Sequence, residues 1–131
     1  LEPNLASLEK RNPPHDTRTV DVKTLDQYNF LDVDLIKIDV EGHENKVIMG
    51  SIDTLKTSSP VLIVEIEQRH ISNPIDEVFN IIVNLGYKGF FLTEGHLASL
   101  STFSYERNQK PYLSNVLHNN YVNNFIFLPR D

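Results

Sequence analysis

The sequence predicts an α/β fold with mostly parallel strands. Two apolar runs, residues 33–40 and 61–66, are nearly continuous, as in strands that are buried on both faces. The segment between them, residues 44–57, carries one apolar helical stripe formed by Ile48, Ile52 and Leu55. A strand, a helix and a second strand of this kind form a right-handed βαβ unit, so the two strands should be parallel neighbours.

The composition suits a single domain over residues 1–131, which is long enough to bury about two thirds of its unfolded surface. The formal charge of -6 disfavours nucleic acid as a partner. No apolar run approaches the roughly 20 residues that span a bilayer, and the absence of cysteine fits the cytoplasm. Because the chain begins with Leu1, we expect a processed product or a fragment of a longer protein.

The N-terminal elements are short. Residues 1–18 contain three prolines and no periodicity, so we expect an irregular lead-in. Alternation over residues 20–23 predicts a short, half-exposed strand. Thr24 and Gln27 match a capping box and predict a helix from residue 25 to about residue 31. Asp26 should favour the first turn of that helix through its dipole.

The second half continues the alternation of helices and strands. Asn73 as N-cap and Pro74 at the first helical position predict a helix that ends near Gly86, a left-handed C-cap. A third strand over residues 87–92 and a last strand over residues 121–128 should follow. The long connection between them, residues 93–121, should hold its own short helices or act as a functional lid, and of the two we favour the lid.

Residues 34–44, Asp-Leu-Ile-Lys-Ile-Asp-Val-Glu-Gly-His-Glu, resemble the signature of the FkbM-type methyltransferases. Residues 20–26 and 124–129 agree with the flanking parts of that family, so the resemblance runs from about residue 19 to residue 129. It implies the C-terminal half of a Rossmann-like class I methyltransferase sheet, with helices on both faces. The last strand would lie antiparallel between the second and third strands.

The same resemblance implies S-adenosylmethionine as cofactor, which related enzymes hold on a glycine-rich turn after their first strand. The five glycines of this chain include no Gly-x-Gly. We therefore expect the cofactor-binding half to lie outside these 131 residues, and the chain to be inactive alone.

Acidic residues lie at the carboxyl ends of both central strands of the predicted sheet. If these strands are adjacent and parallel, Asp39 and Glu41 meet Glu65 and Glu67 at one edge, where open α/β sheets bind ligands. Lys37 shares a strand face with Asp39 and either forms a structural ion pair or tunes its charge. Asp39 could accept a proton or orient the substrate.

The resemblance implies catalytic roles for Asp39, Glu41, His43 and Glu65. Asp39 would lie nearest the transferred methyl group and be the one cofactor contact in this chain, with the others on the acceptor side. His43 could be a general base or a surface residue. The simpler interpretation of Glu44 and Glu67 is that both are solvated.

Other polar residues are weaker candidates. The histidines outside residues 34–44 show no metal-ligand spacing and should lie in loops: His15, His70, His96 and His118. Three residues of the long connection could line a substrate pocket, although loop surface is the simpler interpretation: Tyr105, Arg107 and Tyr112.

The resemblance favours O-methylation of a hydroxyl on a sugar or natural product, with a small-molecule or glycan acceptor. One alternative is a non-catalytic binding or assembly module that forms a homodimer through the exposed edge of the first central strand. Another is a hydrolase that binds a divalent metal ion on the same carboxylates.

Overall fold

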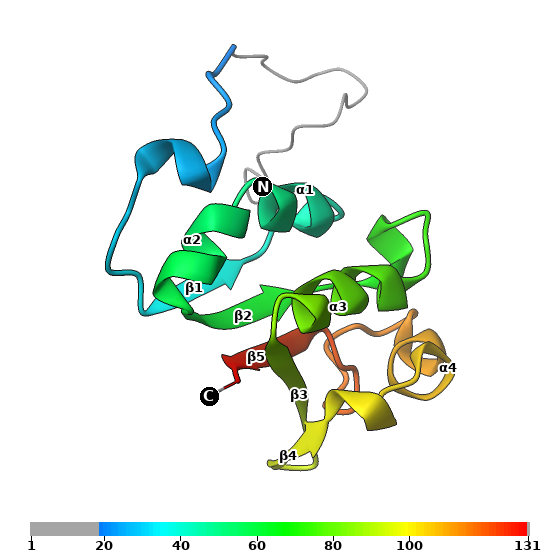
Figure 1. The fold of residues 1–131 in the computed structure, drawn as a ribbon. Helices are drawn as coiled ribbons and strands as arrows, with labels where there is room; N and C mark the ends of the chain where they lie inside the picture. The colour runs from blue at the N-terminus through cyan, green and yellow to red at the C-terminus, as the bar shows by residue number, and fades with distance from the viewer. Residues whose placement is uncertain (1–18, 131) are drawn as a thin grey trace.

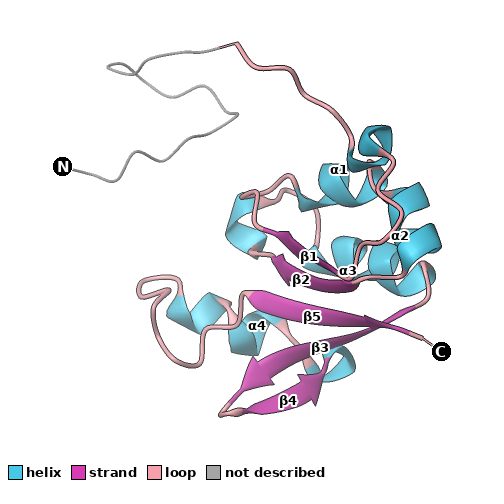
Figure 2. Ribbon diagram, turned by 90° about the vertical axis from the view of Figure 1, so that its left-hand side faces the viewer, coloured by secondary structure: helices cyan, strands magenta, loops and turns pink. Residues whose placement is uncertain are grey.

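The computed structural model describes residues 19–130 (Figure 1). The lead-in of residues 1–18, with His15, lies outside the described part of the chain. Five strands form one sheet in the order β1-β2-β5-β3-β4, which Figure 2 shows from one edge to the other. Their bounds are Leu35–Ile38 (β1), Val61–Glu65 (β2), Tyr87–Thr93 (β3), His96–Ser99 (β4) and Asn124–Pro129 (β5).

Within residues 19–130, eight short helical segments connect and cover the strands. The α-helices are Glu44–Met49 (α1), Ile52–Ser58 (α2), Ile75–Asn84 (α3) and Tyr105–Asn108 (α4). The 3-10 helices are Leu25–Tyr28 (η1), Gln68–His70 (η2), Leu100–Thr102 (η3) and Lys110–Tyr112 (η4). Helices α1, α2 and α3 gather on one side of the sheet (Figure 1).

The sheet is mixed, and most of its pairings are antiparallel. In the described part of the chain only β1 and β2 pair in parallel, whereas β5 is antiparallel to both β2 and β3, and β4 is antiparallel to β3. The prediction of mostly parallel strands was therefore wrong, although β5 lies between β2 and β3 as expected. The sequence pattern missed β4, which follows a two-residue turn at Glu94 and Gly95, both at positive φ, as in a tight hairpin.

The hydrophobic core lies on the helix-covered face of the sheet. Leu62 and Val64 of β2 face it together with Phe125 and Phe127 of β5, and none of the four is exposed to solvent. Phe79 of α3 packs its ring 4.7 Å from that of Phe125. Aromatic and aliphatic burial at this interface is the main source of stability for the domain.

The opposite face of the sheet is only partly covered in residues 19–130. Ile63 and Ile126 pair across it and are half-buried, and Leu35 of β1 is 54% exposed. Burial of the central strands on both faces was therefore a wrong prediction for this part of the chain. An apolar run in a strand does not itself determine which faces are covered.

The helix predicted over residues 44–57 is broken at Gly50 and Ser51. The Ser51 hydroxyl donates to the Val47 carbonyl at 2.6 Å, and the Gly50 carbonyl accepts a hydrogen bond from the Asp26 amide at 3.0 Å. A side chain at residue 50 would press on Thr24. Gly50 therefore lies where η1 docks against the break, with little room for a side chain.

The segment before β1 differs from its prediction in two ways. Residues 20–23 form no strand, and Val22 is 79% exposed. The capping box of Thr24 and Gln27 is present, but it begins a single 3-10 turn. Asp26 lies in the first turn of its own helix as expected, and its carboxylate also caps α2, because it accepts hydrogen bonds from the Thr54 amide at 2.9 Å and the Asp53 amide at 3.1 Å.

The third helix and the long connection lie close to their predicted positions. α3 begins one residue later than expected, and its first amide, Ile75, donates to the Gln68 side chain at 2.7 Å instead of to Asn73. Gly86 has the predicted left-handed conformation, with φ 98°. Residues 93–121 hold the predicted short helices as well as β4.

Candidate active site

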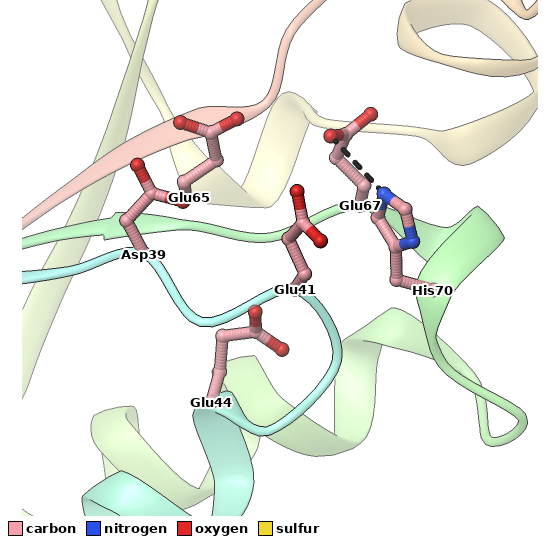
Figure 3. Close-up of a pocket in the computed structure, with 6 residues that line it drawn as sticks. All are labelled: Asp39, Glu41, Glu44, Glu65, Glu67 and His70. Atoms are coloured by element: carbon pink, nitrogen blue, oxygen red, sulfur yellow. Dashed lines mark ion pairs between the residues drawn. The ribbon is translucent and has the colours of Figure 1, made fainter. Parts of the chain in front are cut away.

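A pocket opens where β1 and β2 end (Figure 3). It has a volume of about 170 Å³, is open to solvent, and is lined by Asp39, Glu41, Glu44, Glu65, Glu67 and His70. The parallel pairing of β1 with β2 brings the predicted residues Asp39, Glu41 and Glu65 together. His43 is the N-cap residue of α1 and does not line the pocket.

The turn after β1 is held in an unfavourable conformation. Glu41 and Gly42 both have positive φ, at 45° and 95°. A side chain at residue 42 would collide with the backbone carbonyl of His70, so the loops after β1 and β2 touch at this glycine. A left-handed glutamate is uncommon and costs roughly 1 kcal/mol, and such strain occurs preferentially at functional sites.

Lys37 lies between the two carboxylates on the sheet side of the pocket. Its ammonium is 3.6 Å from Asp39 and 3.7 Å from Glu65, which confirms the predicted proximity of Lys37 to Asp39. Burial, followed by the negative charge of Asp39, raises the pKa of Glu65 above its ordinary value despite Lys37. The Asn123 side chain also donates to Glu65 at 2.8 Å.

Glu67 is a buried, fully partnered carboxylate and is only 7% exposed. Arg69 binds both of its oxygens, at 2.7 and 3.0 Å, and the Tyr121 hydroxyl donates to one of them. Burial raises the pKa of Glu67, but the hydrogen bonds from Arg69 and Tyr121 outweigh it and lower the pKa below its ordinary value. The interpretation of Glu67 as solvated was therefore wrong.

Glu44 is buried as well, with 2% of its surface exposed, so its interpretation as solvated was also wrong. One carboxylate oxygen, Oε1, accepts a hydrogen bond from the Gly42 amide at 2.9 Å and closes the strained turn. The other oxygen, Oε2, is buried and has no hydrogen-bond partner among the described residues 19–130. Figure 3 shows the Glu44 side chain rising from α1 toward the side chain of Glu41.

The candidate residues of the long connection lie outside the pocket. Arg107 donates to the Thr102 carbonyl at 2.9 Å, Tyr112 stacks on His118, and neither these residues nor Tyr105 line the pocket. Within residues 19–130, no group of three or more His, Asp or Glu could hold a metal ion. No helix in that part of the chain has the length and hydrophobicity to span a bilayer.

The sequence interpretation missed Arg69, Tyr121 and His70 at the site. Tyr121 lies 54 positions from Glu67 along the chain, so no local pattern connects them. His70 is placed by the contact of its carbonyl with Gly42, which a motif search does not reveal. Only the repetition of Glu65 and Glu67 after an apolar strand indicated a polar site at this end of β2.

A βαβ unit with carboxylates at both strand ends defines an α/β domain of the kind that binds ligands at the edge of its sheet. The family model of the methyltransferase FkbM domain matches residues 2–88, and the chain belongs to this family. The match includes every residue that lines the pocket. No curated protein and no solved structure matches the chain.

Proposed function

We propose that this protein is an S-adenosylmethionine-dependent methyltransferase that methylates a hydroxyl group on a sugar or another natural product. The observation that carries the proposal is the position of the carboxylate pocket inside the region that matches the methyltransferase family. Transfer of a methyl group to a hydroxyl requires alignment of the acceptor oxygen and a base for its proton. The pocket offers both kinds of group.

Glu65 is the proposed base. The pKa of Glu65 is raised, so it lies nearer to neutral pH than that of an ordinary glutamate. A carboxylate whose pKa is nearer the working pH is a better proton acceptor. Asn123 and Lys37 contact the Glu65 carboxylate and fix its direction. The proton of the acceptor hydroxyl would pass to Glu65 while Asp39, at the end of β1, orients the acceptor.

The residues of this pocket do not fit the whole cofactor. Sites for ligands of that size are lined mainly by apolar and aromatic side chains, whereas this pocket is lined by five carboxylates and His70. The glycines of the chain form no Gly-x-Gly turn. S-adenosylmethionine supplies the methyl group in reactions of this class, and we assign to the pocket the acceptor side, with Asp39 as the residue nearest the cofactor.

A binding or assembly module is the second candidate, and the position of β1 favours it. Within residues 19–130, β1 pairs only with β2 and its other edge is open, and Leu35 on this strand is 54% exposed. An open strand edge can pair with a second copy of the chain. Light scattering that shows a monomer at high concentration would exclude a homodimer formed in this way.

The test of the first proposal uses the protein at its full encoded length. Cofactor binding is measured by calorimetry, and transfer of labelled methyl groups is measured with a panel of sugars and other hydroxyl compounds. We expect Asp39→Asn and Glu65→Gln to reduce kcat by about 10²-fold or more, while Glu94→Gln, on the exposed β3–β4 turn, leaves kcat unchanged. Wild-type kcat in both pocket variants would contradict the assignment.

A further inference from the structure

The unpartnered oxygen of Glu44 is the starting observation. A buried carboxylate oxygen without a hydrogen bond is strongly disfavoured, and such groups in native proteins usually have a partner in a bound molecule or water. Oε1 has a structural role because it accepts the Gly42 amide, but nothing among residues 19–130 pairs with Oε2. The Glu44 side chain lines the pocket, so a group bound there can provide the missing donor.

The charges around the pocket are not balanced. Lys37 contacts Asp39 and Glu65, and Arg69 contacts Glu67. His70 lies 3.6 Å from Glu67, and its backbone meets Gly42 in the turn after β1. Glu41 and Glu44 have no ion pair within the described part of the chain.

The excess negative charge therefore lies beside the buried oxygen of Glu44. A bound group with both positive charge and hydrogen-bond donors would satisfy the two features together. A neutral hydroxyl would satisfy only the hydrogen bond, and a quaternary ammonium would satisfy only the charge.

We infer that the pocket binds a protonated amino group of the acceptor, with one N–H donated to Oε2 of Glu44 and the charge shared with Glu41. An ammonium is compact and has three diverging donors, which suits carboxylates that approach from different elements. The planar fork of a guanidinium suits a bidentate carboxylate in one plane. This inference rests on the proposed function and makes it more specific: the methylated hydroxyl belongs to an amino-bearing acceptor.

The binding test uses 2-aminoethanol, which carries both an ammonium and a hydroxyl. Amide chemical shifts of the labelled protein are followed by NMR during titration. We expect a millimolar Kd, in line with the few non-hydrogen atoms of the probe, and the largest shifts at Gly42 and Glu44. Choline, which lacks N–H donors, and ethylene glycol, which lacks charge, should each bind at least about tenfold more weakly.

Matched variants distinguish the loss of the Glu44 charge from a loss of folding. Glu44→Gln keeps an oxygen that can accept the Gly42 amide but loses the charge, and we expect it to weaken 2-aminoethanol binding about tenfold or more. Glu94→Gln removes an exposed charge outside the pocket and should change the Kd less than twofold. If the spectrum of Glu44→Gln shows unfolding, the test uses Glu41→Gln instead, because Glu41 is on the exposed side of the turn. We expect the same loss of 2-aminoethanol binding from this variant.

Binding is measured without cofactor and without methyl transfer, so its failure is distinct from failure of the proposed function. Equal binding of 2-aminoethanol and ethylene glycol, or unchanged binding in the folded Glu44 or Glu41 variant, would overturn the inference. Magnesium chloride that produced the same shifts at lower concentration would also overturn it. The proposed methyltransferase activity would then still be tested by the methyl-transfer assay described above, with acceptors that lack an amino group.

Discussion

The side-chain amide of Gln109 donates a hydrogen bond to the backbone carbonyl of Ile66 at 2.9 Å. The same amide nitrogen donates to the Val122 carbonyl at 2.8 Å, and the Gln109 oxygen accepts the Gln68 amide at 2.9 Å. Gln109 is completely buried. One side chain from the long connection therefore holds the backbone on both sides of Glu67.

Replacing Gln109 with leucine should destabilise the protein by about 3 kcal/mol, because several buried backbone groups lose their partner. Urea unfolding followed by circular dichroism measures this change. Gln27→Leu is the control, since Gln27 is exposed and only completes a capping box, and it should lower the free energy of unfolding by less than about 1 kcal/mol. Similar losses in the two variants would show that Gln109 does not hold the site.

Asp26→Asn should make the stability less dependent on acid pH. Burial raises the pKa of Asp26, but hydrogen bonds from Thr54 and Asp53 outweigh it, so the folded pKa lies below the ordinary 3.8. The stabilisation from this charge is present above pH 3.8 and is lost as the pH falls through the folded pKa.

At pH 7 the variant should therefore be less stable by about 1 kcal/mol, as for loss of a helix cap. The difference should shrink below pH 3.8. Unfolding curves measured across the acid range check this, with Asp76→Asn, on the exposed first turn of α3, as the control. A constant difference at every pH would contradict the role of the Asp26 charge.

Gly42→Ala should damage the site more than Gly86→Ala does. The two glycines have nearly the same φ, 95° and 98°, so the backbone strain of an alanine is similar at both. A Cβ at residue 86 meets open space, whereas one at residue 42 meets the His70 carbonyl. We expect about 1–2 kcal/mol of destabilisation from strain at Gly86 and a clearly larger loss at Gly42. Equal losses would mean that the two loops can separate freely.

Local patterns predicted the elements that position the site. The apolar run before Asp39, the glycine after Glu41 and the helical stripe at Ile48 were sufficient to predict strand, turn and helix. The adjacency of β1 and β2 followed from the general handedness and length of βαβ units. The residue pattern alone was therefore enough to place Asp39 and Glu65 together.

Long-range contacts explain what could not be predicted. The burial of Glu67 depends on Tyr121, which arrives from another part of the chain, and glutamate is normally exposed unless it is paired. The antiparallel place of β5 was expected from the family resemblance, but β4, which adds another antiparallel pairing at the edge of the sheet, was not. The hairpin turn at Glu94 and Gly95 was a local signal, but it was hidden within a segment interpreted as one long connection.

Tyr121→Phe should remove a pH-dependent part of the stability. The pKa of Glu67 lies below its ordinary value of 4.5 because hydrogen bonds from Arg69 and Tyr121 outweigh the effect of burial. Such a group stabilises the fold above pH 4.5, and that stability is lost as the pH falls through the folded pKa. Without the Tyr121 hydroxyl the pKa of Glu67 rises, so less of this stability remains.

The variant should lose about 2 kcal/mol at pH 7, as for a hydrogen bond to a charged group. The loss should narrow as the pH falls below 4.5, because Glu67 becomes neutral in both proteins. Tyr87→Phe is the matched control: Tyr87 is also buried, but its hydroxyl donates to the neutral carbonyl of Leu55 at 3.5 Å. Its effect on the free energy of unfolding should be smaller and constant between pH 3 and pH 7, roughly 1 kcal/mol or less. Parallel pH curves for the two variants would show that Tyr121 does not stabilise the charge of Glu67.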